Sequence, residues 1–230
     1  MLSAEGLTHA FGSPPVRALD GVSFRLESGH TLAVFGPNGA GKTTLLKVLA
    51  GLIRPQAGRV QVHGGRRAIG WLGHHSHLYA HLTVRENLLF CGSLYDVPAA
   101  GRGPRVDDLM RRLGLADRAA QPVAALSRGL VQRAAIARAL VHEPRVLLLD
   151  EPFTGLDLAA AAELRRLLAE LARGGRAVVL ATHNVEEGVE LATEIAFQHR
   201  GRFVQLAPRA GRDRTQVADA YRKAVGVSGA

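Results

Sequence analysis

Apolar residues follow two different periods along this chain of 230 residues. Short segments in which apolar residues alternate or run together predict strands, because successive side chains of a strand point to opposite faces and a fully buried strand is apolar on both. The predicted strands cover residues 2–7, 19–26, 31–35, 60–62, 68–72, 146–149 and 177–181, with a hairpin at 194–205.

Helical periodicity dominates a different part of the sequence. Between about residues 82 and 141 apolar residues recur every three or four positions, and prolines and glycines divide this section into several helices. Further helices are predicted at 43–50, 158–173 and 185–192. The second of these carries leucines on one stripe and ends before Gly174 and Gly175, as expected of an amphipathic helix.

The order of these elements predicts an α/β fold. Strands that alternate with helices favour a largely parallel sheet covered on both faces. An antiparallel β region is predicted at the N-terminus. The helical section is then a lobe, about residues 76–145, inserted in one domain of residues 1–206. Residues 207–230 are predicted to form a short basic C-terminal arm with one helix.

Composition narrows the class of protein. Lys and Arg number 29 against 20 Asp and Glu, a net charge of +9, but the arginines are spread over Ala- and Leu-rich helices without interleaved aromatic residues. This distribution favours solvated helix faces over a nucleic-acid surface. Cys91 is the only cysteine, no apolar run approaches about 20 residues, and the start lacks a secretory pattern. We therefore expect a cytoplasmic protein that does not bind nucleic acid.

The glycine-rich segment after the strand at 31–35 predicts a phosphate-binding loop. It fits the pattern GxxxxGK[ST] between a strand and a helix, the context in which backbone N–H groups and a helix N-terminus surround phosphate oxygens. Lys42 is expected to reach the β- and γ-phosphates, and the Thr43 hydroxyl to bind Mg²⁺. The predicted nucleotide-binding residues here are Gly36, Pro37, Asn38, Gly39, Ala40, Gly41, Lys42, Thr43 and Thr44.

Two adjacent acids end the apolar strand at 146–149. Burying a charge is costly, so Asp150 and Glu151 at this place indicate a function. Asp150 is expected to bind Mg²⁺ indirectly or through water, and Glu151 to polarise the water that attacks the γ-phosphate. A simple helix cap remains the structural alternative.

Three further segments resemble the ATPases of ABC transporters. Residues 126–133, LSRGLVQR, resemble the LSGGQ-type signature of that family; residues 154–157, TGLD, resemble its D-loop; and residues 181–183, ATH, resemble its switch histidine at a strand end. Together with the phosphate loop and the two acids, they follow the family's order over about residues 2–206. The resemblance implies a P-loop ABC ATPase core with the inserted helical lobe.

The resemblance also implies roles for individual residues. ABC ATPases work as head-to-tail pairs, so Ser127 and the backbone of Gly129 would contact the ATP held by Lys42 of a second cassette. His183 would hydrogen-bond the γ-phosphate beside Glu151, and Asp157 would link the two sites. Phe11 lies where family members carry an aromatic residue that stacks on adenine.

The sequence departs from the family pattern at two places. A glutamine that usually enters the helical lobe is missing, and His75 is interpreted as the residue in its position. Imidazole suits hard Mg²⁺ poorly, so His75 is expected to act through its charge or only through packing. In the signature, Arg128 replaces the first glycine and Leu130 the glutamine, but Ser127 and Gly129 remain, so hydrolysis is expected to survive these departures.

The resemblance extends to a type of transporter. Residues 72–75, 82–88 and 151–157 are most similar to the haem-exporter subunit of bacterial cytochrome c maturation; other exporter subunits and importer subunits remain alternatives. It implies ATP and Mg²⁺ as ligands, an integral membrane subunit and a second cassette as partners, and a place on the cytoplasmic face of the cell membrane. A soluble non-transport ABC ATPase and a nucleotide-gated scaffold are the alternatives from other classes.

Overall fold

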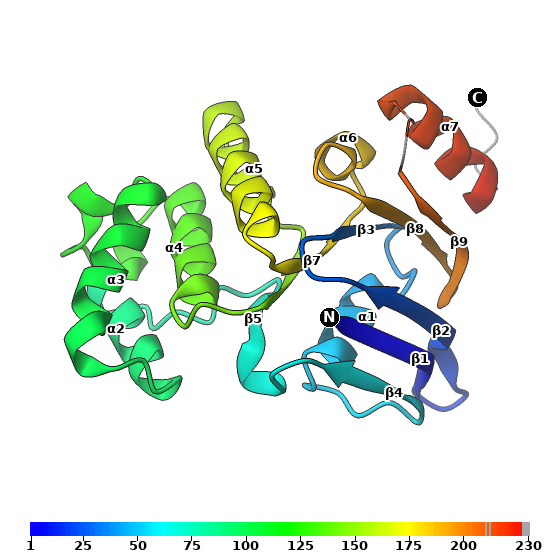
Figure 1. The fold of residues 1–230 in the computed structure, drawn as a ribbon, viewed down its shortest axis with the longest axis horizontal. Helices are drawn as coiled ribbons and strands as arrows, with labels where there is room; N and C mark the ends of the chain where they lie inside the picture. Colours follow the sequence, from blue (N-terminus) through cyan, green and yellow to red (C-terminus); the bar gives the residue numbers. More distant parts are fainter. Residues whose placement is uncertain (210, 212, 227–230) are drawn as a thin grey trace.

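The computed structural model describes residues 1–209, 211 and 213–226, whose strands form two sheets (Figure 1). The smaller sheet is antiparallel and has the order β2 (Val16–Leu26), β1 (Leu2–Phe11) and β4 (Ala57–Val62). The larger sheet has six strands in the order β5 (Ile69–Leu72), β6 (Val146–Asp150), β7 (Ala177–Thr182), β3 (Thr31–Phe35), β8 (Glu194–His199) and β9 (Arg202–Pro208). All its pairings are parallel except β8 with β9.

One face of the large sheet packs against helix α1 (Lys42–Leu49) and the small sheet. Every residue of β3, β6 and β7 is buried, and alternate residues such as Val34, Leu148 and Val179 share one core cluster with Leu45 and Leu46 of α1. These strands are therefore apolar on both faces, as a central parallel sheet requires. The cluster fixes α1 beneath the strand that precedes it.

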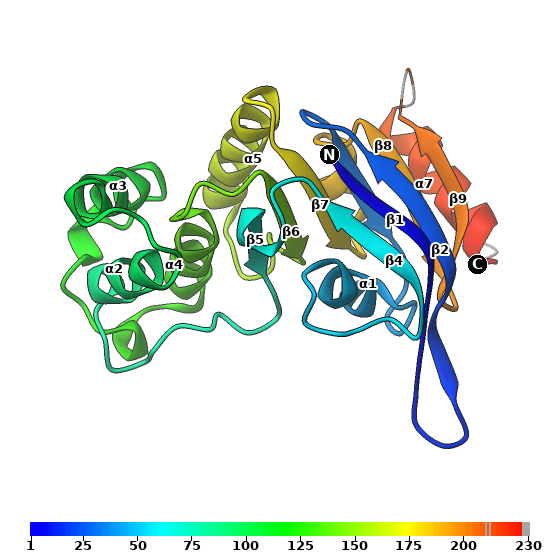
Figure 2. The same cartoon turned by 60° about the horizontal axis from the view of Figure 1, so that its bottom comes forward.

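The opposite face of the sheet is covered by helices. Helix α5 (Leu158–Arg173) shares a core cluster with Leu147, Leu149 and Leu180 of the sheet, and this cluster continues into the lobe formed by α2 (Val84–Leu94), α3 (Ala99–Arg112) and α4 (Arg128–Leu140). Figure 2 shows these three helices as a separate group beside the sheets. None of the helices in the described part of the chain is long and apolar enough to cross a bilayer.

Local sequence explains where the lobe begins. The Thr83 hydroxyl accepts a hydrogen bond from the Glu86 backbone N–H, while the Glu86 carboxylate accepts from the Thr83 backbone N–H. This reciprocal capping box satisfies the first donors of α2. Asn87, which is buried, bonds both the N–H and the C=O of Tyr79. The loop between β5 and α2 is thus tied to the helix that follows it.

The prediction of an α/β fold with an antiparallel N-terminal region and a helical lobe is confirmed. The boundaries differ at both ends of the chain. Strands β1 and β2 extend into a hairpin that ends at Phe11 and Val16, because the two strands continue to pair beyond the apolar alternation. Helix α6 (Val185–Val189) ends three residues before the predicted limit.

Part of the predicted C-terminal arm is packed on the domain. Strand β9 continues to Pro208, and helix α7 (Arg214–Val225) buries Val217 against Phe35 and Phe197 of the large sheet. Its N-cap, Asp213, forms a capping box with Gln216. Residues 210, 212 and 227–230 of the predicted arm lie outside the described residues.

Candidate phosphate-binding and hydrolytic site

The loop between β3 and α1 needs glycine at two positions. A Cβ at Gly36 would lie 2.4 Å from the carbonyl oxygen of Gln198, and a Cβ at Gly41 would lie 2.0 Å from that of Ala18. Gly41 also has a φ of 103°, in a region that side chains disfavour. The loop therefore sits tightly between β2 and β8, with its backbone close to theirs.

A cavity of about 330 Å³ lies over this loop. It opens at the N-terminus of α1, where unpaired backbone N–H groups and the helix dipole favour an anion. Residues from β1, β2, β6 and the segment after β5 complete its wall. The lining residues are Phe11, Ala18, Pro37, Asn38, Gly39, Ala40, Gly41, Lys42, Thr43, Thr44, His74, Asp150 and Glu151.

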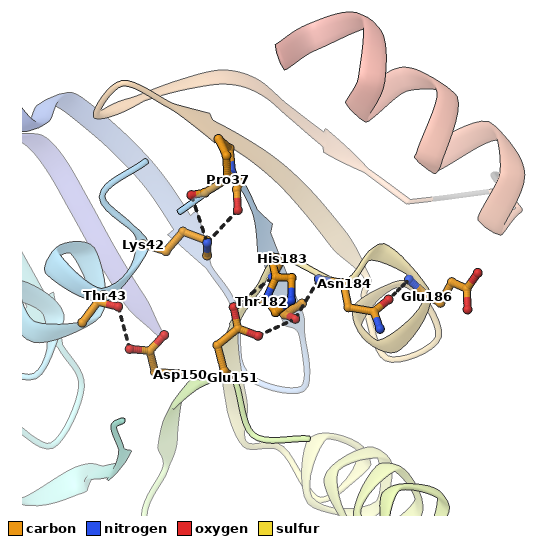
Figure 3. Close-up of polar contacts among 10 residues, drawn as sticks. Pro37, Lys42, Thr43, Asp150, Glu151, Thr182, His183, Asn184 and Glu186 are labelled. Carbon is orange, nitrogen blue, oxygen red and sulfur yellow. Dashed lines mark hydrogen bonds and ion pairs between the residues drawn. The ribbon is translucent and has the colours of Figure 1, made fainter. Parts of the chain in front are cut away.

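Lys42 places its ammonium group inside the loop (Figure 3). Its Nζ donates to the carbonyl oxygens of Gly36 at 2.6 Å and Pro37 at 3.3 Å. Burial lowers the pKa of Lys42, while the carboxylates of Glu151 and Asp150 act in the opposite direction. Gly36 thus contributes a carbonyl group to the site rather than a part of the cavity wall.

Thr43 and Asp150, which both line the cavity, are in direct contact. The Thr43 hydroxyl donates to Asp150 Oδ2 at 2.8 Å, joining residues 107 positions apart in the sequence. Burial raises the pKa of Asp150, against the hydrogen bond from Thr43. The prediction that both residues serve one site agrees with this contact.

These two oxygen donors fit a magnesium ion. Mg²⁺ binds hard oxygen ligands, and sites for nucleotide-bound Mg²⁺ use one or two protein oxygens while substrate phosphates and water complete the octahedron. Among the residues that the structure describes there is no group of three or more His, Cys, Asp or Glu side chains able to hold a metal. A site made by Thr43 and Asp150 alone matches the nucleotide-dependent type.

Glu151 and His183 are in direct contact. Glu151 Oε1 accepts from the His183 backbone N–H at 3.0 Å and lies 2.8 Å from its Nδ1, while Oε2 accepts from the Thr182 hydroxyl at 2.9 Å (Figure 3). Glu151 has a φ of 49°, an uncommon conformation for this residue type. The end of β7 therefore holds the carboxylate on both oxygens at the edge of the cavity.

His75, interpreted from the sequence as the residue in the glutamine position, does not line the cavity over the phosphate loop. His74 lines the cavity with Asp150 and Glu151, and its charge acts on Asp150. His75 instead lies near His77, with ring centroids 6.3 Å apart. Strand β5 ends at Leu72, two residues before His74.

The aromatic candidate lies at the mouth of the cavity. Phe11 is 47% exposed and packs edge-on against His9, with centroids 4.5 Å apart. An exposed ring beside a phosphate loop offers a face on which a base can stack. The structure thus places the predicted adenine-stacking residue on the wall of the same cavity as Lys42.

Three other predicted residues lie away from this cavity. Ser127 begins α4, where its hydroxyl accepts from the Leu130 N–H at 3.4 Å, and Gly129 follows in the first turn. Asp157 begins α5 and accepts from the Ala160 N–H at 2.8 Å. Ser127 and Asp157 thus cap helix N-termini, and none of the three residues lines the cavity over the phosphate loop.

Comparison with known proteins agrees with this geometry. Residues 19–154, more than half of the chain, match the ABC transporter family. The chain belongs to the ATP-binding proteins of ABC transporters. The ABC cassette seen here is 38% identical to the daunorubicin resistance ATP-binding protein DrrA3 of Streptomyces coeruleorubidus, over 94% of this chain and 72% of that one. It is 35% identical to the ATP-binding protein NatA of Bacillus subtilis, over 82% and 81%.

Solved structures show the same cassette. An ATP-binding cassette in a dimeric post-hydrolysis state with ADP and phosphate superposes with a TM-score of 0.85 at 26% identity, covering 92% of this chain and all of that one. The ATP-binding subunit of an ABC transporter superposes with a TM-score of 0.84 at 28% identity over the full length of this chain and 95% of that one. The chain is therefore an ABC-type ATPase with the P-loop fold.

Sequence reasoning missed two residues of this ABC cassette. Thr182 was not proposed for the site, yet its hydroxyl donates to Glu151. A polar residue as the last position of an otherwise apolar strand was the available signal. His74, which lines the cavity, was not proposed either, because His75 was assigned to the glutamine position and the end of a short strand is uncertain from sequence by a residue or more.

Proposed function

We propose that this chain binds and hydrolyses ATP to drive transport by a separate membrane protein. The observation that carries the proposal is the pair of contacts on one cavity wall, Thr43 with Asp150 and Glu151 with His183. The first pair supplies oxygen ligands at the phosphate loop, and the second supplies a base held in place by its neighbour. A protein that bound nucleotide without hydrolysing it would need only the pair Thr43 and Asp150.

The residues divide the chemistry among them. The loop N–H groups and Lys42 bind the phosphates, and Mg²⁺ held by Thr43 and Asp150 would neutralise charge on the transferred group. Glu151 accepts the proton of the attacking water as the oxygen–phosphorus bond forms and the bond to ADP breaks. His183 orients Glu151 through its backbone and ring, and its other ring nitrogen is free to contact the γ-phosphate.

The same proposal includes pairing with a second cassette. Ser127 and Gly129 lie outside the cavity of their own chain, at a helix N-terminus suited to an anion. A second chain in head-to-tail orientation would place this end of α4 on the γ-phosphate held by Lys42. The similar cassette with bound ADP and phosphate is a dimer, which supports such a pair.

Steady-state hydrolysis tests the catalytic part. MgATP should be hydrolysed by the wild-type chain and not by Lys42→Ala, because the substitution removes the cation nearest the phosphate loop. ATP binding should weaken in the same variant. Hydrolysis by Lys42→Ala at the parental rate would overturn the site, and binding without hydrolysis by the wild type would favour a nucleotide-gated scaffold.

The membrane partner and its cargo form the finer part of the proposal. Residues 72–75, 82–88 and 151–157 resemble a haem-exporter subunit, which supports haem export for cytochrome c maturation. Similar proteins are named for daunorubicin resistance, Nod factor export, and import of iron and sulfate, so export of another small molecule is the second candidate. A cytoplasmic site against the inner face of the membrane follows from either.

Co-purification and a deletion phenotype separate these cargoes. The tagged chain, extracted in mild detergent, should bring down an integral membrane protein. Under haem export, deletion of the gene should abolish covalently haem-bound c-type cytochromes, and the wild-type gene should restore them while Glu151→Gln does not. Normal c-type cytochromes in the deletion strain would leave another exported molecule as the cargo. A chain with no membrane partner would indicate a non-transport ATPase.

A further inference from the structure

The N-terminal part of α4 packs against the turn that follows Glu151. The Gln132 Nε2 donates to the carbonyl oxygen of Pro152 at 3.0 Å. A Cβ at Gly129 would lie 3.1 Å from the carbonyl oxygen of Gly155. The helical lobe and the end of β6 are therefore joined next to the hydrolytic residues as well as through the core.

Arg128 adds the third contact of this kind. A Cβ at Gly155 would lie 3.3 Å from both Cγ and Nε of Arg128, and 3.4 Å from its Cδ. The stem of Arg128 thus lies across Gly155, whose φ of 80° needs a residue without a side chain. A side chain at position 155 would occupy the place that the arginine stem takes.

The charge of Arg128 has no counterpart in this arrangement. Within the described ranges no carboxylate forms an ion pair with Arg128, and the first turn of α4 has no acidic residue. A cation at the first position of a helix is also opposed by the helix dipole. The contact with Gly155 is made by the aliphatic stem and Nε, so packing explains the placement of this side chain better than its charge.

The turn under Arg128 determines the backbone at Glu151. The Thr154 N–H donates to the Glu151 carbonyl oxygen at 3.2 Å, and the Leu156 N–H donates to that of Phe153 at 3.1 Å. Phe153 is buried in the core. Two successive turns thus run from Glu151, in its left-handed conformation, to the residue that Arg128 covers. A displacement of the Gly155 backbone would therefore be passed through these two turns to the Glu151 carboxylate.

We propose that Arg128 is a positioning residue, whose stem holds the turn at residues 151–156 so that Glu151 keeps its orientation toward the cavity. The inference rests on the proposed hydrolysis of ATP and adds to it a residue outside the cavity. It gives position 128 a role that glycine, the residue usual there in the family resemblance, could not perform. The lobe would then act on Glu151 by packing.

The test compares three substitutions at position 128. Arg128→Gly removes the stem, Arg128→Met keeps its length without charge, and Arg128→Lys keeps both length and charge. We expect Arg128→Gly to lower kcat about five-fold, equivalent to about 1 kcal/mol of barrier, with KM and ATP affinity unchanged. Met and Lys should retain at least about half of the parental kcat, since a conserved stem conserves the contact.

A matched control removes an arginine from a surface helix elsewhere. Arg166→Gly lies on the exposed part of α5 and costs about 1 kcal/mol in helix propensity, more than glycine costs at the first position of α4. It should lower the melting temperature without lowering kcat. Arg128→Gly should do the reverse, which separates positioning of Glu151 from loss of stability.

Two results would overturn this inference while the proposed function stands. One is an unchanged kcat in Arg128→Gly beside an inactive Glu151→Gln. The other is that Arg128→Met loses as much activity as Arg128→Gly while Arg128→Lys stays active. That result would show that the charge at position 128 supports turnover and not the aliphatic stem. A wild-type chain without ATPase activity would instead refute the proposed function, and this inference with it.

Discussion

The Nδ1 of His183 lies 2.8 Å from Oε1 of Glu151, and this contact joins the ends of two neighbouring parallel strands. The same oxygen accepts the His183 backbone N–H. The carboxylate is thereby fixed by two groups of one residue, while the Thr182 hydroxyl occupies its other oxygen. The entropy cost of orienting the Glu151 carboxylate is therefore met once, during folding, and not again at each turnover.

Glu151→Gln should keep this geometry and lose the base. The amide has the size of the carboxylate and can still accept the His183 N–H, so ATP binding should persist. Loss of a general base lowers the rate by about 10² to 10⁴. Light scattering in MgATP should then detect a stable dimer, because the shared nucleotides are no longer cleaved. A monomer at every ATP concentration would contradict the proposed pairing.

Asp150→Asn should stabilise the free protein while it abolishes hydrolysis. Burial raises the pKa of Asp150, so the folded state favours the protonated form. The stability linked to that proton is present below the unfolded pKa near 3.8 and is lost as pH rises through the higher folded value. Asparagine cannot ionise, so Asp150→Asn avoids that loss of stability. A gain of about 1 kcal/mol in the free energy of unfolding raises the melting temperature by about 2–4 °C in a domain of this size.

Thermal unfolding without nucleotide measures this effect. The melting temperature of Asp150→Asn should exceed that of the wild type at pH 7, and the difference should shrink toward pH 4. Thr43→Ala serves as the comparison, since it removes the hydrogen bond and leaves the carboxylate buried. An Asn variant that melts lower than the wild type at pH 7 would show that the charged form of Asp150 is favoured by its surroundings.

His74 rather than His75 should affect turnover. His74→Ala removes a side chain from the cavity wall and should lower kcat several-fold, whereas His74→Gln restores a hydrogen-bonding group and should retain or raise it. His75→Ala is the control, because its ring lies beside His77 and not in the cavity. Equal loss in both alanine variants would show that the whole loop matters and not the imidazole of His74.

Alanine should be tolerated very differently at two glycines of the phosphate loop. At Gly39 nothing lies within 4 Å of a Cβ, so Gly39→Ala costs only the left-handed conformation, about 1–2 kcal/mol. At Gly41 the added atom meets the Ala18 carbonyl oxygen at 2.0 Å as well. Gly41→Ala should therefore melt well below Gly39→Ala. Similar melting temperatures would mean that β2 moves freely away from the loop.

Regular elements with strong periodicity could be predicted from the sequence. The segments Thr31–Phe35 and Leu158–Arg173 have the predicted limits, because an all-apolar run and a leucine stripe leave few alternatives. The end of the hairpin at Phe11 and Val16 could not be predicted from the sequence. The exposed residues of this hairpin pair through their backbones and show no apolar alternation. Long-range polar contacts such as Thr182 with Glu151 depend on which strands are neighbours, and a single sequence does not specify that order.

The order of the large sheet has a consequence for synthesis on the ribosome. Strand β3 emerges early, but its two neighbours in the sheet, β7 and β8, are both in the last quarter of the chain. Thr31 and Thr193, which bond each other, are 162 positions apart. Throughout most of translation β3 has both edges unpaired and is apolar on both faces, the state most prone to aggregation. A nascent chain that stalls within the helical lobe would expose this strand. Rare codons or truncations there should therefore increase dependence on chaperones.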